Sequence, residues 1–403
     1  MATPTVVARR LDGRTRWSLG WPLPFQLWFP LMVYGVSRLI AAAFMIAAAA
    51  PAHRSGYADL ATAWDGDWYR LIATQGYPSS LPIGIDGQVE PNAWAFSPVY
   101  PLIVRALMAV TGLGYSVVAP SLSLVLGAAA MVVIFVLMQR AVGRFSACAC
   151  VVLTCTFMAA PVMQLAYAES LALLLLAGAL LLLRERKYLG VAALLLLLAL
   201  TRPVVLAFIP VVIAHGLGRW RGRVADPFSR KDQRAVVLLG AFCIAATGLW
   251  PVIVGLITGD LFAWTKTQDA WRPGRYFGPG MGWPASFLFN YGWPALAMLA
   301  LIVLLTLGIV LRPGAKAWGP ELRTWSVAYP GYLLLATVPV PSVIRWLLLG
   351  FPLMWPFPEA AATRSERRFR VIFIGVLVIV GLAMQWVWVS TFLAAAAPSY
   401  RYP

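Results

Sequence analysis

Long apolar runs separated by short charged segments dominate the sequence. Runs of about 20 residues recur along the chain, and as helices they are long enough to cross the hydrocarbon core of a membrane. The pattern predicts an all-α polytopic membrane protein with about eleven transmembrane helices. The expected spans are 25–50, 116–138, 146–165, 167–183, 188–201, 203–218, 235–258, 293–311, 325–340, 342–358 and 370–396.

The basic residues decide between two topologies. If the run 97–112 crossed the bilayer, the clusters at 184–187 and 219–234 would face outside. If 97–112 lies at the interface, the inside segments hold 22 Lys and Arg residues and the outside segments hold 9. The positive-inside rule therefore predicts an inside N-terminus, an outside C-terminus and an interfacial 97–112. Pro98 and Pro101 also disfavour a continuous helix there.

This topology divides the chain into four parts. They are a basic inner N-terminus (1–24), a transmembrane module (25–218) with an outer loop (51–115), a basic inner loop (219–234), and a second module (235–403) with an outer loop (259–292). Helical spans satisfy their own backbone, so irregular polar segments need water or a protein-covered cavity. Polar chemistry is therefore expected in the two outer loops and the short turns beside them.

Composition agrees with this class. Hydrophobic residues make up 61% of the chain and charged residues 12%, against about 45–50% and about 25% in soluble proteins. A net charge of +17 arises from short clusters between apolar runs, so topology explains it and no nucleic-acid partner is predicted. Four cysteines in apolar runs and two histidines predict neither a disulfide framework nor a zinc site.

The first outer loop carries the segments WDGDWYRLIATQGYP (64–78) and EPNAWAFSPVYPL (90–102). Asp65 and Asp67 precede an expected helix, where an acidic residue often only caps the backbone. Two carboxylates among aromatic rings instead suit a bound sugar, although an interfacial aromatic belt is the alternative. The neighbouring rings are Trp64, Trp68 and Tyr69.

Other ionisable residues are expected at the same face. Glu169 begins a span, where a carboxylate must reach water or a charged partner. The alternative is that it only interacts favourably with the positive N-terminal end of the helix dipole. Arg202 and Arg345 lie at turns, where arginine can snorkel harmlessly or fork onto phosphate oxygens. Arg38 lies within a span and should face the protein interior. A cationic cover is expected from Lys266, Arg272 and Arg275 in the second outer loop.

The order WDxxWYxxIAxxGY, AFxPxYP, AYxESL and TRP resembles the PIG-V type of GPI mannosyltransferases and their bacterial relatives, members of the GT-C superfamily. The matching positions are Trp64, Asp65, Trp68, Tyr69, Ile72, Ala73, Gly76, Tyr77, Ala95, Phe96, Pro98, Pro101, Tyr167, Glu169 and Ser170, with Arg202 matched more loosely. These motifs lie within about the first 210 residues. Ser97 replaces a phenylalanine that the family tends to have before proline, so the acceptor pocket is expected to differ.

The resemblance implies an inverting sugar transfer, most often of mannose, from a polyprenyl-phosphate sugar to a lipid-linked glycan at the extracytoplasmic face of the plasma membrane, or of the endoplasmic reticulum in a eukaryote. It implies that Asp65 is the general base. The outer cations (Arg202, Arg345, Lys266, Arg272 and Arg275) are expected to bind donor phosphate. Substrate contacts are expected from Trp64, Asp67, Trp68, Tyr69, Tyr77, Phe96, Tyr167 and Glu169. No cofactor is predicted, since a DxD-like pair of Asp65 and Asp67 would hold a divalent metal mainly for a nucleotide diphosphate.

Two alternatives stay open at this point. A lipid or glycolipid transporter or flippase would show inverted repeats and ionisable groups near the membrane midplane, and Arg38 alone fits that pattern. A GT-C enzyme with an arabinofuranose donor or a protein acceptor would keep the same scaffold. A bacterial source would favour a phosphatidylinositol mannoside or related lipoglycan as the acceptor.

Overall fold

The computed structural model describes residues 24–271, 280–357 and 364–395, and it is built from helices. Its α-helices are α1 (Phe25–Ala49), α2 (Tyr57–Thr62), α3 (Asp65–Gln75), α4 (Val99–Thr111), α5 (Tyr115–Val142), α6 (Arg144–Thr156), α7 (Glu169–Arg184), α8 (Tyr188–Ala199), α9 (Ile209–Arg221), α10 (Arg230–Thr258), α11 (Ala263–Ala270), α12 (Gly282–Leu311), α13 (Gly319–Ala336), α14 (Ser342–Trp346) and α15 (Arg364–Trp388). Within the described ranges no β-strand forms, which confirms the expected all-α class.

Five helices are long and apolar enough to cross a membrane: α1, α5, α10, α12 and α15 with the π-turn that follows it. Several other expected spans are interrupted. Residues 146–165 form α6 and then a separate 3-10 turn, Ala160–Gln164, and 203–218 form the turn Val205–Phe208 before α9. Pro161 and Pro203 lie at these breaks, where the missing N–H disfavours a continuous helix.

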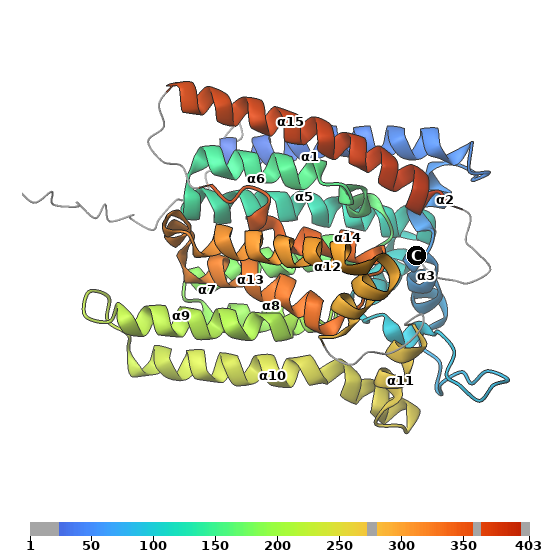
Figure 1. Cartoon of the computed structure of the whole chain (residues 1–403). Helices are drawn as coiled ribbons and strands as arrows, with labels where there is room; N and C mark the ends of the chain where they lie inside the picture. The colour runs from blue at the N-terminus through green and yellow to red at the C-terminus, as the bar shows by residue number, and fades with distance from the viewer. Residues whose placement is uncertain (1–23, 272–279, 358–363, 396–403) are drawn as a thin grey trace, which may run out of the picture.

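The bundle runs roughly parallel to one axis, and the connecting segments gather at its two ends (Figure 1). Helices α2, α3 and α11 lie at one end, and the α9–α10 hairpin reaches the other. Helix α4 has 13 residues and packs on α3 and α5. At 1.5 Å per residue it is about 20 Å long, too short to cross a hydrocarbon core of about 30 Å. The expectation that 97–112 does not span the membrane agrees with this length.

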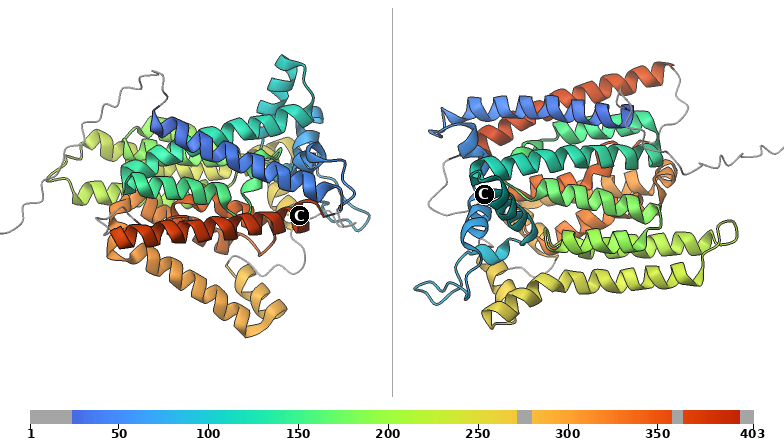
Figure 2. Two further views of the ribbon diagram at one scale, coloured as in Figure 1. Left: turned by 90° about the horizontal axis from the view of Figure 1, so that it is seen from above. Right: turned by 180° about the vertical axis from the view of Figure 1, so that it is seen from behind.

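The core is centred on α7, which packs on α5 and α8. Peripheral α12 is mostly exposed and is bent where Gly292 has a φ of 76°; the left view of Figure 2 shows it lying outside the bundle. Arg38, within α1, is 5% exposed, so it faces the interior as expected. Its guanidinium donates to the carbonyls of Cys155 (3.2 Å) and Ala160. These carbonyls flank the break after α6, so Arg38 satisfies backbone that a continuous helix would have paired.

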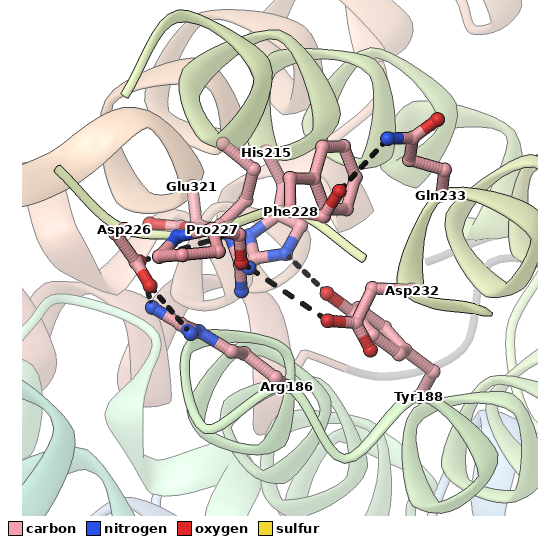
Figure 3. Close-up of polar contacts among 10 residues, drawn as sticks. Arg186, Tyr188, His215, Asp226, Pro227, Phe228, Asp232, Gln233 and Glu321 are labelled. Carbon is pink, nitrogen blue, oxygen red and sulfur yellow. Dashed lines mark hydrogen bonds and ion pairs between the residues drawn. The ribbon is translucent and has the colours of Figure 1, made fainter. Parts of the chain in front are cut away.

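A polar network lies beside the α9–α10 hairpin (Figure 3), at the end of the bundle away from α3 in Figure 1. His215 Nδ1 lies 2.7 Å from Glu321 Oε1, and the Tyr188 hydroxyl lies 3.3 Å from His215 Nε2. Arg184 donates to Glu321 (3.4 Å) and to the carbonyl of Trp318 (2.7 Å). Arg186, between α7 and α8, pairs with Asp226, between α9 and α10, and Arg219 of α9 donates through Nη2 to the carbonyl of Pro227. We call these residues the His215 network; they tie together α7, α9, α13 and the loops between them.

Candidate active site

An unusual backbone at Trp64 positions the first acidic side chain. Trp64 has φ 61° and ψ −116°, a conformation that costs a non-glycine residue about 1–3 kcal/mol. Its indole Nε1 donates to the carbonyl of Leu393 at 3.0 Å, which holds the ring in place. Helix α3 begins at the next residue, so Asp65 stands in its first turn with 6% of its surface exposed. The turn therefore directs this carboxylate into the protein.

Glu169 reaches the same place from the middle of the chain. It is the first residue of α7 and is 1% exposed. The segment before it is fastened to the first loop, because the Ala166 N–H donates to the carbonyl of Ala61 at 2.7 Å and the Tyr167 hydroxyl donates to the carbonyl of Ala63 at 3.2 Å. This backbone pairing brings the start of α7 beside the start of α3.

Two arginines complete the group. Arg345 belongs to the short helix α14 and is 6% exposed, and Arg202 lies in the break after α8. Arg345 Nη2 lies 2.6 Å from Asp65 Oδ2, and Nη1 lies 3.2 Å from Glu169 Oε1. Arg202 forms an ion pair with the same oxygen of Glu169. We call these four residues the Asp65 cluster; its two acids and two bases balance in formal charge.

Aromatic rings and neighbouring carboxylates hold the two guanidinium groups. The Arg345 guanidinium lies over the Tyr167 ring at 4.8 Å, and that of Arg202 lies 5.9 Å from the ring of Trp346. Burial lowers the pKa of Arg202, but the neighbouring acidic groups, Glu169 foremost, together outweigh burial and raise that pKa above its ordinary value. Against the same effect of burial, the charges of Asp65 and Glu169 raise the pKa of Arg345. Both guanidinium groups therefore stay charged at any physiological pH.

Two cavities meet at Arg345. The larger, of about 310 Å³, contains Asp65, Tyr69, Arg202 and Arg345 in its wall, together with Phe96. The smaller, of about 200 Å³, is more apolar. It is lined by Trp64, Tyr167, Pro341, Ser342, Arg345, Trp388, Thr391, Phe392, Leu393 and Ala395. Among the side chains that line these two cavities in the described structure, Asp65 is the acidic one.

Aromatic side chains build one wall of the larger cavity. The rings of Phe96 and Trp271 line it, with centroids 5.5 Å apart in an edge-to-face arrangement. The ring of Trp68 stacks on that of Phe96, with centroids 5.9 Å apart, and does not line the cavity. Burial raises the pKa of Tyr69 above its ordinary value, so its hydroxyl keeps its proton and can donate a hydrogen bond into the cavity.

The fold has counterparts among solved structures, although no protein-family model matches the sequence and no curated protein matches it. The crystal structure of the Archaeoglobus fulgidus oligosaccharyltransferase in complex with Zn and sulfate matches 90% of this chain with a TM-score of 0.51 and 12% identity. The same enzyme tethered with an acceptor peptide through a disulfide bond matches 93%, with a TM-score of 0.51 and 11% identity. The chains share a fold.

That fold agrees with the GT-C-like, all-α membrane architecture expected from the sequence. The present chain spans about half of its length, 53% and 56% in the two structures. At 11–12% identity the likeness shows the fold alone, an all-α polytopic membrane architecture like that of GT-C enzymes. It does not separate the PIG-V type from other members of the superfamily.

Within this GT-C fold, several residues singled out from the sequence lie away from the two cavities. Asp67 is exposed and pairs with Arg70 at 2.7 Å, because α3 begins at Asp65 and turns the two carboxylates apart. Tyr77 stacks on Trp94 at 4.5 Å in a separate hydrophobic cluster. Lys266 is exposed and pairs with Asp260 at 2.6 Å. Arg272 and Arg275 lie outside the described residues.

The structure also brings forward residues that the sequence did not single out. Gln268 and Trp271 both line the larger cavity. Helix α11 and the residue after it carry these side chains, and they are pinned to the first loop by Asn92, which contacts Thr267 Oγ1 at 3.3 Å and accepts from Trp271 Nε1 at 3.2 Å. The sequence held a weak signal in the polar stretch TKTQDAW after a long apolar helix. Its proximity to Asn92 depends on tertiary packing.

A metal site does not form from the DxD-like pair. Asp65 faces Arg345 and Asp67 faces Arg70, so the carboxylates do not converge. Within the described parts of the chain, no group of three or more His, Cys, Asp and Glu side chains is placed to hold a metal ion. The absence of a metal requirement stays a prediction for experiment.

Proposed function

We propose that this chain is an inverting glycosyltransferase that moves mannose from a polyprenyl-phosphate-mannose donor to a lipid-linked glycan at the extracytoplasmic face of the membrane. The observation that carries the proposal is the Asp65 cluster, which places a carboxylate and two arginines at one cavity within a GT-C fold. Buried charged groups are costly, so a cluster that opens onto a cavity is a candidate for function.

Asp65 has the position of a general base. In an inverting transfer the acceptor hydroxyl attacks the anomeric carbon, its proton passes to the carboxylate, and the bond from that carbon to the phosphate oxygen breaks with its electron pair leaving on the phosphate. A double displacement would use one carboxylate as a nucleophile and a second acid–base group. Glu169 is 1% exposed and lines neither cavity, so Asp65 is the one carboxylate in the two cavity walls. A single carboxylate suits the single displacement of an inverting transfer.

Arg202 and Arg345 suit the leaving phosphate. Both line the larger cavity beside Asp65, and a guanidinium can donate two parallel hydrogen bonds to phosphate oxygens. Positive charge next to the leaving oxygen stabilises the negative charge that develops as the bond breaks. These arginines therefore perform the work that a metal would perform in an enzyme that uses nucleotide sugars.

The walls of the two cavities suit a sugar and lipids. Phe96 and Trp271 offer ring faces to the apolar side of a pyranose, and Gln268 and Tyr69 offer polar atoms to its hydroxyls. The smaller cavity has Trp388 and Phe392 from the end of α15, which suit an isoprenoid or acyl chain. The resemblance to the PIG-V type supports mannose as the sugar and a phosphatidylinositol mannoside or related lipoglycan as the acceptor.

A direct assay tests the proposal. Purified protein would be incubated with polyprenyl-phosphate mannose or polyprenyl-phosphate arabinofuranose and with membrane glycolipids as acceptors. Transfer and the released polyprenyl monophosphate would be quantified by mass spectrometry. We expect stoichiometric release and transfer with the mannose donor, unaffected by a chelator, and none from the Asp65→Asn protein prepared in parallel.

Three outcomes would change the proposal. Transfer from the arabinofuranose donor alone would reassign the sugar. Loss of activity with chelator and its return with a divalent cation would show a metal requirement. No transfer from either donor, together with movement of intact glycolipid across reconstituted vesicles, would favour a transporter.

A further inference from the structure

Arg345 already faces two carboxylates before any substrate arrives. Its Nη2 lies 2.6 Å from Asp65 Oδ2 and 3.4 Å from the Ser342 hydroxyl, and Nη1 lies 3.2 Å from Glu169 Oε1. The ring of Tyr167 covers one face of the guanidinium. The side chains of Arg345 and Asp65 are 7% and 9% exposed, so water screens their attraction little.

A donor phosphate cannot simply be added to this arrangement. The two acids and two arginines of the Asp65 cluster already cancel in charge, and an additional buried anion would lack compensation. Arg345 Nη2 lies 2.6 Å from Asp65 Oδ2, so a phosphate that binds this edge of the guanidinium competes with that carboxylate for the same N–H groups. One carboxylate of the cluster must therefore give up Arg345 when the phosphate binds.

Asp65 is the partner placed to leave. It lines the larger cavity and begins a short helix in a loop. Glu169 is 1% exposed, pairs with both arginines and is the first residue of the central helix α7. Moving Glu169 would break two buried ion pairs, whereas moving Asp65 breaks one.

Resting on the proposed function, we infer that Asp65 and the donor phosphate hold Arg345 in turn. In the free protein Asp65 occupies the guanidinium. When donor enters the larger cavity, its phosphate displaces the carboxylate, which turns toward the acceptor hydroxyl. Glu169 and the Tyr167 ring keep Arg345 in place during the exchange, so they act as positioning residues. Arg345 thereby couples donor binding to the release of the base, and donor should bind before acceptor.

The exchange makes a prediction that a simple phosphate site would not. If Asp65 competes with phosphate for Arg345, removing its charge should strengthen phosphate binding. We expect the Asp65→Asn protein to bind polyprenyl monophosphate about tenfold more tightly than wild type, since tenfold corresponds to the loss of a modest ion-pair competitor. Affinity would be measured by titrating detergent-purified protein and following its intrinsic tryptophan fluorescence.

Matched variants make the test specific. Asp59→Asn removes another ion-paired aspartate of the same loop, paired with Arg54 at 3.4 Å, and should leave the affinity unchanged. Arg345→Gln should weaken binding at least tenfold, and Asp65→Asn added to it should bring no further tightening, which is the coupling expected of a shared partner. Asp65→Ser provides a second charge-removing variant if the asparagine protein melts abnormally.

Equal or weaker phosphate binding in both folded Asp65 variants would overturn the exchange, as would a wild-type protein that binds no polyprenyl monophosphate. These results are separable from failure of the proposed function. Tighter binding in Asp65→Asn without any sugar transfer by wild type would support the exchange and refute the transferase. Normal sugar transfer by wild type, with no tighter phosphate binding in the Asp65 variants, would support the transferase and refute the exchange.

Discussion

An ionic group lies at each end of helix α7. The two groups resemble each other in composition but differ in what surrounds them. Glu169 at its start belongs to the Asp65 cluster, and Arg184 at its end belongs to the His215 network, about 22 Å away along the helix axis. Both groups join arginines to buried carboxylates. The Asp65 cluster lines two cavities, whereas neither of those cavities reaches the His215 network.

The comparison shows that two ion networks of similar composition can differ in the groups that their arginines face. In the His215 network, Arg184 ends on the carbonyl of Trp318 and Arg219 on that of Pro227, so these side chains tie backbone segments together. In the Asp65 cluster, the two arginines instead pair with carboxylates, and both of them line the larger cavity. The role of an arginine at the end of a span therefore cannot be assigned from the sequence until the atoms that its guanidinium faces are known.

The largest contrast between the two ends concerns the side of the membrane. We expect the Asp65 cluster to lie on the outer side of the membrane and the His215 network on the inner side. A cysteine at Gln88, exposed in the first loop, should react with an impermeant maleimide in intact cells, and one at Val224, 94% exposed in the α9–α10 hairpin, should not. Labelling would be read by mass shift in a background without native cysteines. Reaction at position 224 from outside would invert the topology.

The next largest effect is expected from replacing Arg202, an arginine of the Asp65 cluster. Arg202→Lys keeps the charge but not the planar fork that grips two phosphate oxygens. We expect the donor KM to rise about 10- to 100-fold, the equivalent of one or two charge-assisted hydrogen bonds. The measurement is initial rates against donor concentration at saturating acceptor. Unchanged donor kinetics would show that Arg202 only anchors Glu169.

The matching change in the His215 network should affect stability and not catalysis. Burial would raise the pKa of Glu321, but His215 and Arg184 outweigh burial and lower it. A lowered carboxyl pKa adds stability that is present at neutral pH and is lost as the pH falls through the folded-state value. Glu321→Gln should remove about 1–3 kcal/mol, the worth of hydrogen bonds to a charged group.

That loss would be measured as a lower melting temperature at pH 7, with a smaller difference from wild type in acid. The donor KM and kcat should stay within twofold of wild type at a temperature where both proteins are folded. A kcat that falls with no change in melting temperature would show that this end of the molecule also takes part in the reaction.

Much of this architecture follows from one-dimensional patterns. Apolar periodicity predicts the helices, and the prolines at 98 and 101 mark 97–112 as a short separate helix. The sequence pattern predicts continuous spans over 146–165 and 203–218, where the structure has breaks after α6 and before α9, because short apolar runs look alike whether or not the helix is interrupted. Nothing local in the sequence reports that Arg38 satisfies the carbonyls exposed by one of these breaks.

The candidate site was less predictable. Asp65, Glu169, Arg202 and Arg345 each had a stated reason to be polar at that face, but their pairing joins residues up to 280 positions apart, which only helix packing determines. Lys266 instead pairs locally with Asp260, six residues earlier in the sequence, and does not line either cavity. The roles assigned to Trp64, Phe96, Tyr167 and the other aromatic residues stay predictions until variants are assayed.

The central claim is that Asp65 is the base of a sugar transfer, and its nearest competitor lies two residues away. The decisive measurement is the transfer rate from polyprenyl-phosphate mannose to a lipid acceptor by purified Asp65→Asn and Asp67→Asn proteins of equal melting temperature. Asp65→Asn keeps the shape of the side chain and removes its proton acceptor, so kcat should fall about 10²- to 10⁴-fold. Asp67→Asn should cost far less, since Asp67 is exposed and paired with Arg70. Near-normal turnover by the Asp65 variant beside an inactive Asp67 variant would contradict the account.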